Sequence, residues 1–356
     1  MNILDNLEAI KKLDSKNMLG SLELLGEQIK EVLDCAKKIK TFSVYKKVQN
    51  IVVLGMGGST LGSHVIKSLF QNDLKIPMEI INGYHVPAYV NSKTLVLASS
   101  YSGTTEEAVM AMKEAQNKKA KIAIITSGGI LADYAKKFKV PALIFTTENN
   151  PCGSPRMGLG YSIFGQIILL SKLGLLKISS VQIGQAIKIF SKYNDQFGLK
   201  VVEAENIAKR IVNKIGERSV WYVASEHLSG NAHTAGNQIN ENAKRFGGYF
   251  LIPELNHHLM EGMISPKSNQ KELAFILIES NSYDQRVQRR YEITKKVLEK
   301  NGIFNLSYKC TEKDKLSQVC EALSLGSYVS FYLAMQAGID PTAIPFVDFF
   351  KAELKK

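Results

Sequence analysis

The sequence predicts an α/β protein made of two doubly wound parallel-sheet domains, each with helices on both faces of its sheet. Short apolar segments alternate with longer amphipathic ones, and the order helix, strand, small-residue loop, helix recurs in the second half. The length of 356 residues suffices for two such domains. We expect an N-terminal helical segment over 1–48, packed on the first domain, then a first domain over 49–178 and a second over 179–356.

Residues 1–48 are expected to be helical, because apolar side chains recur there at spacings of three and four, as from Leu22 to Leu25 and Ile29. Strands and helices then alternate. The expected strands are 50–54, 78–81, 94–98, 121–126 and 142–145. The expected helices are 60–71, 105–117, 130–138 and a long one over 155–175.

A polar helical connector over 176–197 separates the two halves of the chain. The second half is expected to contain helices at 200–215, 232–245, 284–300 and 315–338. Its expected strands are 219–224, 249–251, 274–279 and 303–308, with a loop over 225–231. The residues of the two halves differ, so the repeat is one of pattern.

The composition is that of an ordinary globular protein, with 45% apolar and 22% charged residues. The net charge of +12 favours anionic ligands. The lysines are scattered in pairs without interleaved aromatic residues, so no nucleic-acid partner is expected. No apolar stretch is long enough to span a membrane. The four cysteines lack CxxC or zinc spacing, and the N-terminus lacks a signal-peptide pattern, so we expect a cytoplasmic protein.

Two loops rich in glycine and hydroxyl residues each follow an apolar strand and precede a helix. The first reads GMGGST over 55–60, and the second reads SSYSGTTEE over 99–107. A turn of this kind directs backbone N–H groups at an anion, and the hydroxyl groups add further donors. A tight turn without a ligand is the alternative for either loop alone, but two such loops on neighbouring strands favour a phosphate.

Neither nucleotide signature is complete in these loops. A Walker A loop needs lysine and then serine or threonine after its last glycine, whereas Gly58 is followed by Ser59 and Thr60. The dinucleotide fingerprint would place Thr60 at its third glycine, and the next strand ends in Asn82 rather than in an acidic residue. The phosphate is therefore expected on a small molecule that is not a nucleotide.

Further motifs follow in order along most of the chain. They are Gly57-Gly58-Ser59, Ser100-Tyr-Ser102-Gly-Thr-Thr105-Glu, Pro155-Arg156, Leu159-Gly-Tyr161, Asn240-Glu241-Asn-Ala-Lys244, Glu254-Leu-Asn-His257, Asp340-Pro and Val347-Asp-Phe-Phe-Lys351. In this order and spacing the chain resembles the bifunctional phosphoglucose/phosphomannose isomerases, which carry two sugar isomerase (SIS) domains in tandem. The resemblance implies two SIS-type sheets, the second being a C-terminal domain of the bacterial phosphoglucose isomerase type.

The resemblance also implies the role of individual residues. The phosphate loop falls on Ser100, Ser102 and Thr105, and the sugar-contacting loop on Gly57, Gly58 and Ser59. The base, the ring-opening histidine, the arginine and the lysine fall on Glu241, His257, Arg156 and Lys351. The family further implies a homodimer in which the neighbouring subunit lends His257.

The implied reaction converts glucose 6-phosphate, and also mannose 6-phosphate, into fructose 6-phosphate, a step of glycolysis and gluconeogenesis. A carboxylate such as Glu241 can move a proton between C1 and C2 if burial raises its pKa. Ring opening needs a group that shuttles a proton near neutral pH, a task for which histidine is the usual side chain; His257 is the candidate, with help from Lys351. Arg156 can stabilise the cis-enediolate, and the phosphate anchors the substrate. No step needs a metal or redox cofactor, so none is expected.

These residues also have structural interpretations. Glu241 could be a solvated surface acid, Arg156 a salt-bridged helix start and Lys351 a frayed terminal lysine. His258-Leu-Met-Glu261 offers two metal ligands, but no convincing third ligand accompanies them, and metal sites generally need three. His257 rather than His258 is chosen because it directly follows the asparagine of the motif.

Two other functions fit tandem SIS domains. One is a different phosphosugar aldose–ketose isomerase, such as the isomerase half of glucosamine-6-phosphate synthase. That enzyme also carries an amidotransferase domain with an N-terminal cysteine, whereas residue 2 here is asparagine. The other is a non-catalytic phosphosugar-binding regulator with a DNA-binding domain, for which 48 residues of mixed charge are too few. Thr342 and Ile344 lie where the family discriminates between the two sugars, so the specificity stays open.

Overall fold

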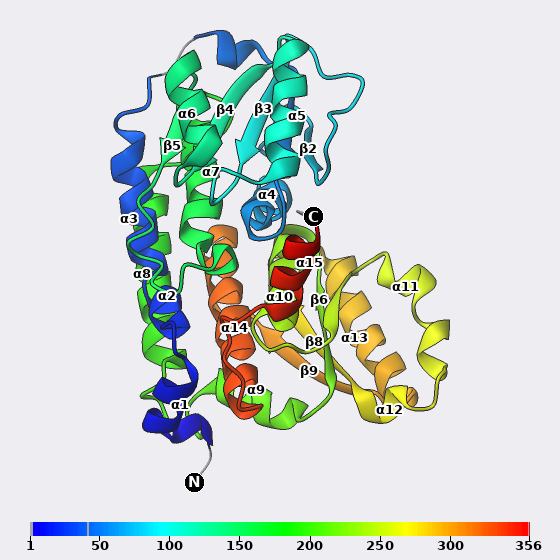
Figure 1. The fold of residues 1–356 in the computed structure, drawn as a ribbon. Coiled ribbons are helices and arrows are strands. Elements are labelled where there is room, and N and C mark those ends of the chain that lie inside the picture. The colour runs from blue at the N-terminus through cyan, green and yellow to red at the C-terminus, as the bar shows by residue number, and fades with distance from the viewer. Residues whose placement is uncertain (1–2, 41–42, 355) are drawn as a thin grey trace.

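Two parallel sheets form the centres of two domains, one above the other in Figure 1. The computed structural model describes residues 3–40, 43–354 and 356. Helices cover both sides of each sheet, so the predicted α/β class is confirmed. No helix in the described part of the chain combines the length and apolar character needed to cross a membrane.

The N-terminal segment is helical, as its apolar spacing predicts. Leu25, Ile29 and Val32 are buried and place one face of α3 against the first domain and α8. The first turn η1 and helix α2 also contact α14 of the second domain, so this segment reaches both domains. The elements are η1 (Ile3–Asp5), α1 (Leu7–Leu13), α2 (Met18–Glu23), α3 (Leu25–Ala36) and η2 (Ser43–Lys47).

The first sheet has five parallel strands in the order β2-β1-β3-β4-β5, which puts the carboxyl ends of β1 and β3 side by side. Its strands are β1 (Asn50–Leu54), β2 (Met78–Ile81), β3 (Thr94–Ser99), β4 (Lys121–Thr126) and β5 (Ala142–Ile144). The helices that follow are α4 (Gly58–Leu69), α5 (Glu106–Asn117), α6 (Gly129–Phe138), α7 (Gly165–Lys172) and α8 (Ser180–Phe197). All five predicted strands are present.

Successive residues of the central strands face opposite sides of this sheet. Ile51 and Val53 of β1 join the core beneath α4 and α7, whereas Val52 and Leu54 pack against α5 and α6. This alternation explains why β1 is an uninterrupted apolar run, since both of its faces are covered by helices.

The long helix predicted over 155–175 is wrong. The structure divides it into the turn η3 (Pro155–Met157), the π-helix η4 (Gly160–Phe164) and α7. The buried side chain of Gln28 stabilises the break, because it donates to the carbonyl of Met157 at 3.1 Å and accepts the N–H of Gly160 at 2.9 Å. A Cβ at residue 160 would lie 2.5 Å from the Cβ of Gln28, so only glycine permits this contact.

The second sheet has four parallel strands in the order β7-β6-β8-β9. They are β6 (Ser219–Ala224), β7 (Gly247–Leu251), β8 (Leu273–Glu279) and β9 (Phe304–Lys309). The surrounding helices and turns are α9 (Ile207–Ile215), η5 (Glu226–Leu228), α10 (Ser229–Glu241), α11 (Leu255–His258), η6 (Glu261–Ile264), α12 (Asn269–Glu272), α13 (Gln285–Lys300), α14 (Lys315–Gln336) and α15 (Pro345–Glu353). The predicted helix over 232–245 thus starts and ends earlier, which places Glu241 on its last turn.

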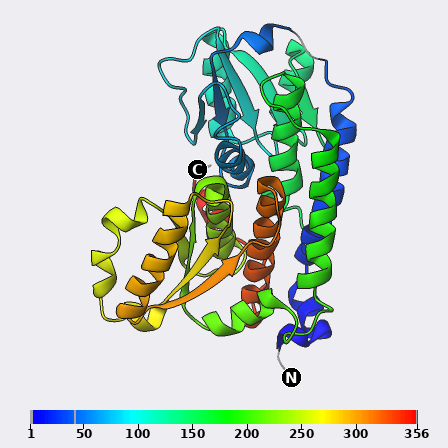
Figure 2. The same ribbon diagram turned by 180° about the vertical axis from the view of Figure 1, so that it is seen from behind.

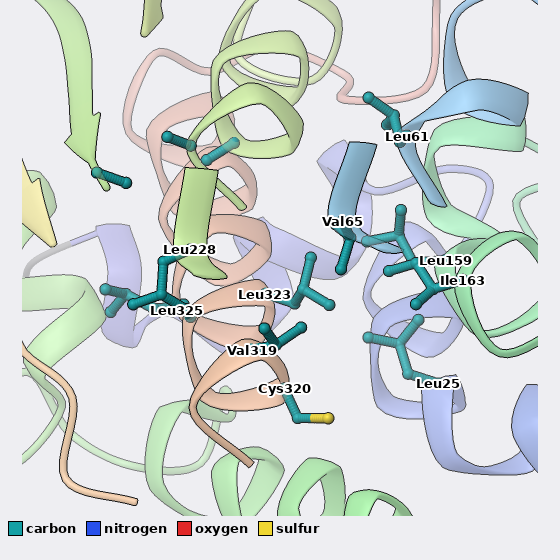
Figure 3. Packing of buried hydrophobic residues seen from close by; sticks show 14 of the residues in the cluster. Leu25, Leu61, Val65, Leu159, Ile163, Leu228, Val319, Cys320, Leu323 and Leu325 are labelled. Carbon is teal, nitrogen blue, oxygen red and sulfur yellow. The ribbon is translucent and has the colours of Figure 1, made fainter. Parts of the chain in front are cut away.

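Helices α4 and α10 join the two domains in an antiparallel crossing. Gly230 allows the close approach, because a Cβ there would lie 2.4 Å from the Cα of Val65. Helix α14 packs beneath both helices, and every residue from Leu316 to Met335 is buried. Figure 3 shows Val65 beside Leu323 of α14, and Figure 2 shows α14 between the second sheet and the long helix α8. The crossing brings the start of α4 to the end of α10.

Candidate active site

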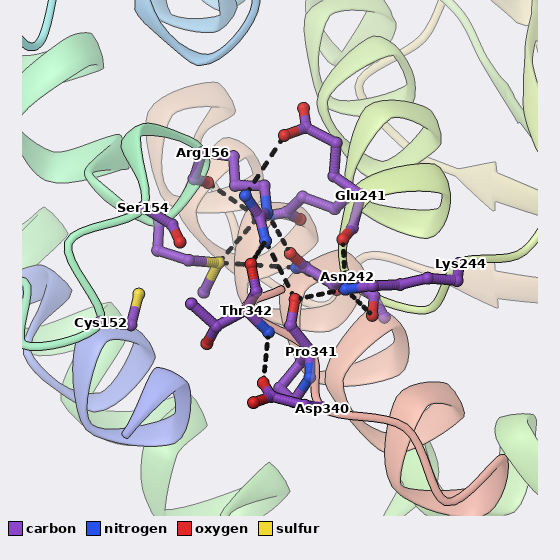
Figure 4. A network of polar contacts seen from close by, with 12 residues as sticks. Cys152, Ser154, Arg156, Glu241, Asn242, Lys244, Asp340, Pro341 and Thr342 are labelled. Atoms are coloured by element: carbon purple, nitrogen blue, oxygen red, sulfur yellow. Dashed lines mark hydrogen bonds and ion pairs between the residues drawn. The ribbon is translucent and has the colours of Figure 1, made fainter. Parts of the chain in front are cut away.

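Arg156 is the centre of a buried polar cluster between the two domains (Figure 4). It lies in the turn η3, and its side chain is only 2% exposed. Its Nε donates to Oδ1 of Asn242 at 2.6 Å, and its Nη2 donates to the carbonyls of Pro341 and Thr342 at 2.9 and 3.1 Å. These acceptors lie in the second domain, so the arginine of the first domain is held in one orientation by the second.

Glu241 ends α10 and faces the same guanidinium. Its Oε2 lies 3.3 Å from Nη1 of Arg156, and a third of its side chain, 33%, is exposed. Burial lowers the pKa of Arg156, while the carboxylate of Glu241 acts on that pKa in the opposite direction. The carboxylate therefore has one oxygen beside a fixed cation and one side open to a ligand.

Asn242 fixes this geometry from within the core. It is fully buried, and its amide nitrogen donates to Oγ of Ser330 in α14 at 3.0 Å. The neighbouring Gln238 donates to the backbone carbonyl of Arg156 at 3.3 Å and accepts from Ser327 at 3.1 Å. Both the backbone and the side chain of Arg156 are therefore attached to the α10–α14 pair.

Lys244 adds a second cation at the edge of the cluster. Its Nζ donates to the carbonyls of Glu241, Asn242 and Pro341 at 2.9, 3.3 and 2.8 Å. Burial of the ammonium group and the nearby charge of Arg156 lower the pKa of Lys244 to about 8. The carbonyl of Pro341 accepts from both cations, so the two together hold the segment that leads into α15.

The glycine loop at the start of α4 lies directly against the arginine. Gly57 has a φ of 48°, a conformation that favours glycine. A Cβ on Gly58 would lie 2.7 Å from the backbone nitrogen of Arg156, so this position has no room for a side chain. Ser59 accepts the N–H of Tyr101 at 2.9 Å and so joins this loop to the hydroxyl loop.

The hydroxyl loop between β3 and α5 gathers four side-chain oxygens. Oγ of Ser100 lies 2.7 Å from Oγ1 of Thr105, and Oγ of Ser102 lies 3.0 Å from Oγ1 of Thr104. The N–H of Gly103 donates to Oγ of Ser100 at 3.1 Å. Thr105 precedes α5 without a side-chain capping bond, which leaves donors of the first helical turn available to an anion.

Among the residues that the structure describes, no hydrogen bond or ion pair joins the side chain of His257 or Lys351 to this cluster. His257 is exposed on α11, at the outer edge of the second domain in Figure 1. Lys351 is exposed on α15. The preceding Asn256 donates to Thr294 of α13 at 2.8 Å, which fixes the backbone beside the histidine.

The structure gathers no metal-ligand cluster among the residues that it describes. No group of three or more His, Cys, Asp or Glu side chains converges there, and His258 and Glu261 gain no third ligand. A cavity of about 600 Å³ lies at the opposite end of the α4–α10 crossing. Two histidines line it, His64 and His233, whose rings are tilted by 52° with their centroids 4.0 Å apart. Burial lowers the pKa of both, and that of His64 falls to about 4. This cavity is separate from the Arg156 cluster.

Three members of the cluster were not assigned a role from the sequence: Asn242, Lys244 and the carbonyl of Pro341. Asn242 and Lys244 lie within the motif that contains Glu241, so their proximity was visible, but their partners were not. A backbone carbonyl carries no residue signature at all. The catalytic and binding roles of the residues named from the sequence stay predictions.

Comparison with known proteins assigns the chain to a family. Residues 44–142 match the model of the SIS domain, and residues 200–354 match that of the bacterial phospho-glucose isomerase C-terminal SIS domain. The bifunctional phosphoglucose/phosphomannose isomerase of Caldicellulosiruptor bescii is 33% identical over 95% of this chain and 98% of its own. That of Aquifex aeolicus is 31% identical over 89% and 93%.

Solved structures show the same fold. A hypothetical protein from Thermus thermophilus superposes with a TM-score of 0.72 at 17% identity, over 98% of this chain and 93% of its own. This likeness concerns the fold, whereas the sequence match covers nearly the whole chain at a higher identity. The chain belongs to the family of the bifunctional phosphoglucose/phosphomannose isomerases.

Proposed function

We propose that this protein interconverts glucose 6-phosphate and fructose 6-phosphate. It would also interconvert mannose 6-phosphate and fructose 6-phosphate. One observation carries the proposal: the hydroxyl loop, the Gly58–Ser59 turn, Arg156 and Glu241 form a continuous series of contacts. An anion cradle, a fixed cation and a carboxylate thus lie in succession, which is the order that a phosphosugar isomerase needs. The names of the family members support this reaction class.

The phosphate group would bind at Ser100, Ser102 and Thr105 and would act only as an anchor. Its binding energy would hold C1 and C2 of the open sugar beside Glu241. Glu241 would take the proton from one carbon and return it to the other. Arg156, whose guanidinium cannot rotate away, would stabilise the negative oxygen of the cis-enediolate without reorganisation.

Activity on both sugars draws support from Thr342. Its Oγ1 is buried without a hydrogen-bond partner among the described residues, beside the carbonyl that binds Arg156. A sugar hydroxyl that reached this oxygen would relieve an unpaired buried group. Thr342 lies in the segment where the family discriminates between the two sugars, so we include mannose 6-phosphate. Strict rejection of mannose 6-phosphate, in binding as well as turnover, would contradict this part.

The first experiment is an assay of the purified protein with glucose 6-phosphate and mannose 6-phosphate, with and without a chelator. Turnover of both sugars that survives chelation is expected, because the proposed chemistry uses only protein groups. Loss of turnover on chelation, restored by zinc, would overturn the metal-free mechanism.

Replacement of the base provides a sharper test. Glu241→Gln keeps the shape of the side chain but cannot accept the proton, so turnover should fall by about 10²–10⁴-fold while phosphosugar binding persists. Lys244→Gln is not a suitable control, since it lies in the same cluster, but Glu8→Gln on α1, where the side chain is 86% exposed, is. Retention of more than about a tenth of the wild-type turnover would remove Glu241 as the base.

The ring-opening group would be His257 of a second subunit in a homodimer, aided by Lys351. The observation behind this proposal is that His257 is exposed on α11, which Figure 1 shows apart from α10, the helix that ends in Glu241. Glu241→Gln and His257→Ala chains, each inactive alone, should complement each other when mixed. Half of the dimers would have one intact site of two, so about a quarter of the wild-type activity should return. A mixture that stays inactive after verified subunit exchange would show that each site is built within one chain.

We also place the enzyme in the cytoplasm, in carbohydrate metabolism. All four cysteines are unpaired and three of them are buried, which fits a reducing compartment.

A further inference from the structure

The second sheet repeats the strand order that places the two anion-binding loops of the first sheet side by side. In the first sheet the order β2-β1-β3 makes the glycine loop and the hydroxyl loop neighbours. In the second sheet β6 takes the place of β1, between β7 and β8. Ligands of open parallel sheets bind outside the carboxyl ends of the strands at such a switch point. Because α4 and α10 cross antiparallel, the two switch points open at opposite ends of the crossing.

The cavity of about 600 Å³ lies at this second switch point and is here called the crossing cavity. Its volume is in the range of small-molecule sites. Both domains form its wall, because α4 lines it from the first domain, and η5, α10, β7 and α13 line it from the second. Its polar lining includes His64, Lys67, Gln71, Glu226, Ser229 and His233.

We propose that the crossing cavity is a second binding site, for a phosphate monoester of a small hydroxylated compound, with the phosphate held by His64, Lys67 and His233. Such a site is independent of the isomerase activity, since none of these residues belongs to the Arg156 cluster, the glycine loop or the hydroxyl loop.

Three groups that can carry a positive charge meet in the wall of this cavity. The ring centroids of His64 and His233 are 4.0 Å apart, and the charge of Lys67 acts on His64. Burial, with the charges of His233 and Lys67, lowers the pKa of His64 to about 4, and burial also lowers the pKa of His233. The hydroxyl of Tyr249 lies 3.3 Å from Nδ1 of His233. An anion bound here would offset the repulsion among the three cations and favour the protonated histidines.

The polar side chains at this end of the cavity lack partners in the described part of the chain. Lys67, Gln71 and Ser229 line the cavity without a hydrogen bond or an ion pair to another described residue. The ring of His64 contacts that of His233 and makes no hydrogen bond within the same part of the chain. An ammonium, an amide, a hydroxyl and an imidazole can all donate to phosphate oxygens.

Two other places for an anion in the second domain are already filled by the protein itself. In the first turn of α10, the N–H of Gly230 donates to Oγ of Ser68 at 3.2 Å. In the loop after β8, which corresponds to the hydroxyl loop, Oγ of Ser280 donates to Oε1 of Gln318 at 2.7 Å. Nε2 of Gln318 donates to Oγ of Ser282 at 3.4 Å in the same loop. The side chains beside Lys67 therefore remain as the place for the phosphate.

Glu226 indicates what else the ligand carries. Its Oε1 accepts the N–H of Asp284 at 2.9 Å, and its Oε2 has no hydrogen-bond partner among the described residues. A carboxylate accepts hydrogen bonds from hydroxyl groups and repels a second anionic group. Leu251, Ile252 and Pro253 add an apolar wall for a carbon skeleton. This combination favours a phosphate monoester with free hydroxyl groups over a polycarboxylate.

Nuclear magnetic resonance of the histidine rings tests the site in the full-length protein, which has only six histidines. Inorganic phosphate should shift the His64 resonance and raise the pKa of His64 from about 4 by about 1–3 units, as a nearby opposite charge does. Sodium chloride at the same ionic strength should not. The resonance of His85, whose side chain is 84% exposed, is an internal control and should not respond to phosphate. His64→Gln assigns the resonance.

The same resonance measures the contribution of Lys67 and the class of the ligand. Lys67→Ala should weaken phosphate binding by roughly 10–10²-fold, because a hydrogen bond to a charged group is lost. Lys188→Ala on α8, an exposed lysine outside the cavity, is the matched control and should leave the affinity unchanged. Both variants should keep the wild-type kcat and KM for isomerisation. Glycerol 3-phosphate should bind about two- to tenfold more tightly than inorganic phosphate for each hydroxyl that is bonded.

Three results would overturn the proposal. The first is a His64 resonance that does not respond to phosphate on the order of 10 mM, where even a site with a millimolar Kd is filled. The second is wild-type affinity in Lys67→Ala, which would show that these cations do not hold the anion. The third is tighter binding of citrate than of either phosphate compound, which would assign the cavity to polycarboxylates instead.

Discussion

Replacement of Gly58 by alanine tests whether the glycine loop positions the arginine. The added Cβ would lie 2.7 Å from the backbone nitrogen of Arg156 and 2.8 Å from the carbonyl carbon of Pro155. Both neighbours are backbone atoms, which cannot rotate aside. The start of α4 and the turn η3 must therefore separate by about 0.7 Å before ordinary van der Waals contact is restored.

This separation should affect stability and catalysis together. Overpacking of this kind typically costs about 1–3 kcal/mol, so the urea midpoint should fall by a corresponding amount. Misplacement by about 1 Å can cost as much as ~10²-fold in rate, so kcat/KM should fall by roughly 10–10²-fold. Steady-state kinetics and urea unfolding on the same preparation provide both measurements.

Gly184→Ala is the matched control for this prediction. Gly184 lies within α8, and a Cβ there would meet no heavy atom within 4 Å. The same chemical change should stabilise the protein by about 0.5–1 kcal/mol and leave kcat/KM unchanged, because alanine is the better helix former. If both variants change stability by the same amount and in the same direction, or if Gly58→Ala keeps wild-type kinetics, the reasoning from the close contact is refuted.

Three further predictions concern the same site. Ser100→Ala with Thr105→Ala should weaken the binding of inorganic phosphate and of phosphosugars alike. Each deleted hydroxyl removes a hydrogen bond to a charged group, which contributes about 1.5–3 kcal/mol. Unchanged inhibition by phosphate would count against this loop. Asn242→Ala should lower kcat more than it raises KM and destabilise the fold by about 1–3 kcal/mol, because Nε of Arg156 loses its buried acceptor. Urea unfolding and steady-state kinetics measure the two effects, and an unchanged kcat would contradict the positioning role of Asn242. Lys244 is charged below its pKa of about 8 and neutral above it, so wild-type activity should decline as the pH rises through 8. Lys244→Arg stays charged and should lose that decline, and identical pH profiles of kcat would exclude Lys244 as its source.

Much of the fold could be predicted because its signals are local. The strand β1 is visible as an apolar run that ends in glycine, and α3 as apolar spacing of three and four. The break at Pro155–Phe164 could not be predicted, because its cause is distant in the sequence. The side chain of Gln28 accepts the N–H of Gly160, which lies 132 residues further along the chain. The first turn of α10 was also missed, since Ser229 and Gly230 look like loop residues until α4 packs against them.

The candidate site divides in the same way. The sequence alone determined the two loops, the positions of Glu241 and Arg156 and the family to which the chain is similar, because each of these is a short motif. Only the tertiary structure decided how they are combined. Arg156 finds Asn242 86 residues away and Pro341 185 residues away. These partners meet because α4 and α10 cross and bury the same core, and burial strongly favours a hydrogen-bond partner for each polar group there. The same packing leaves α15 and His257 exposed on the surface.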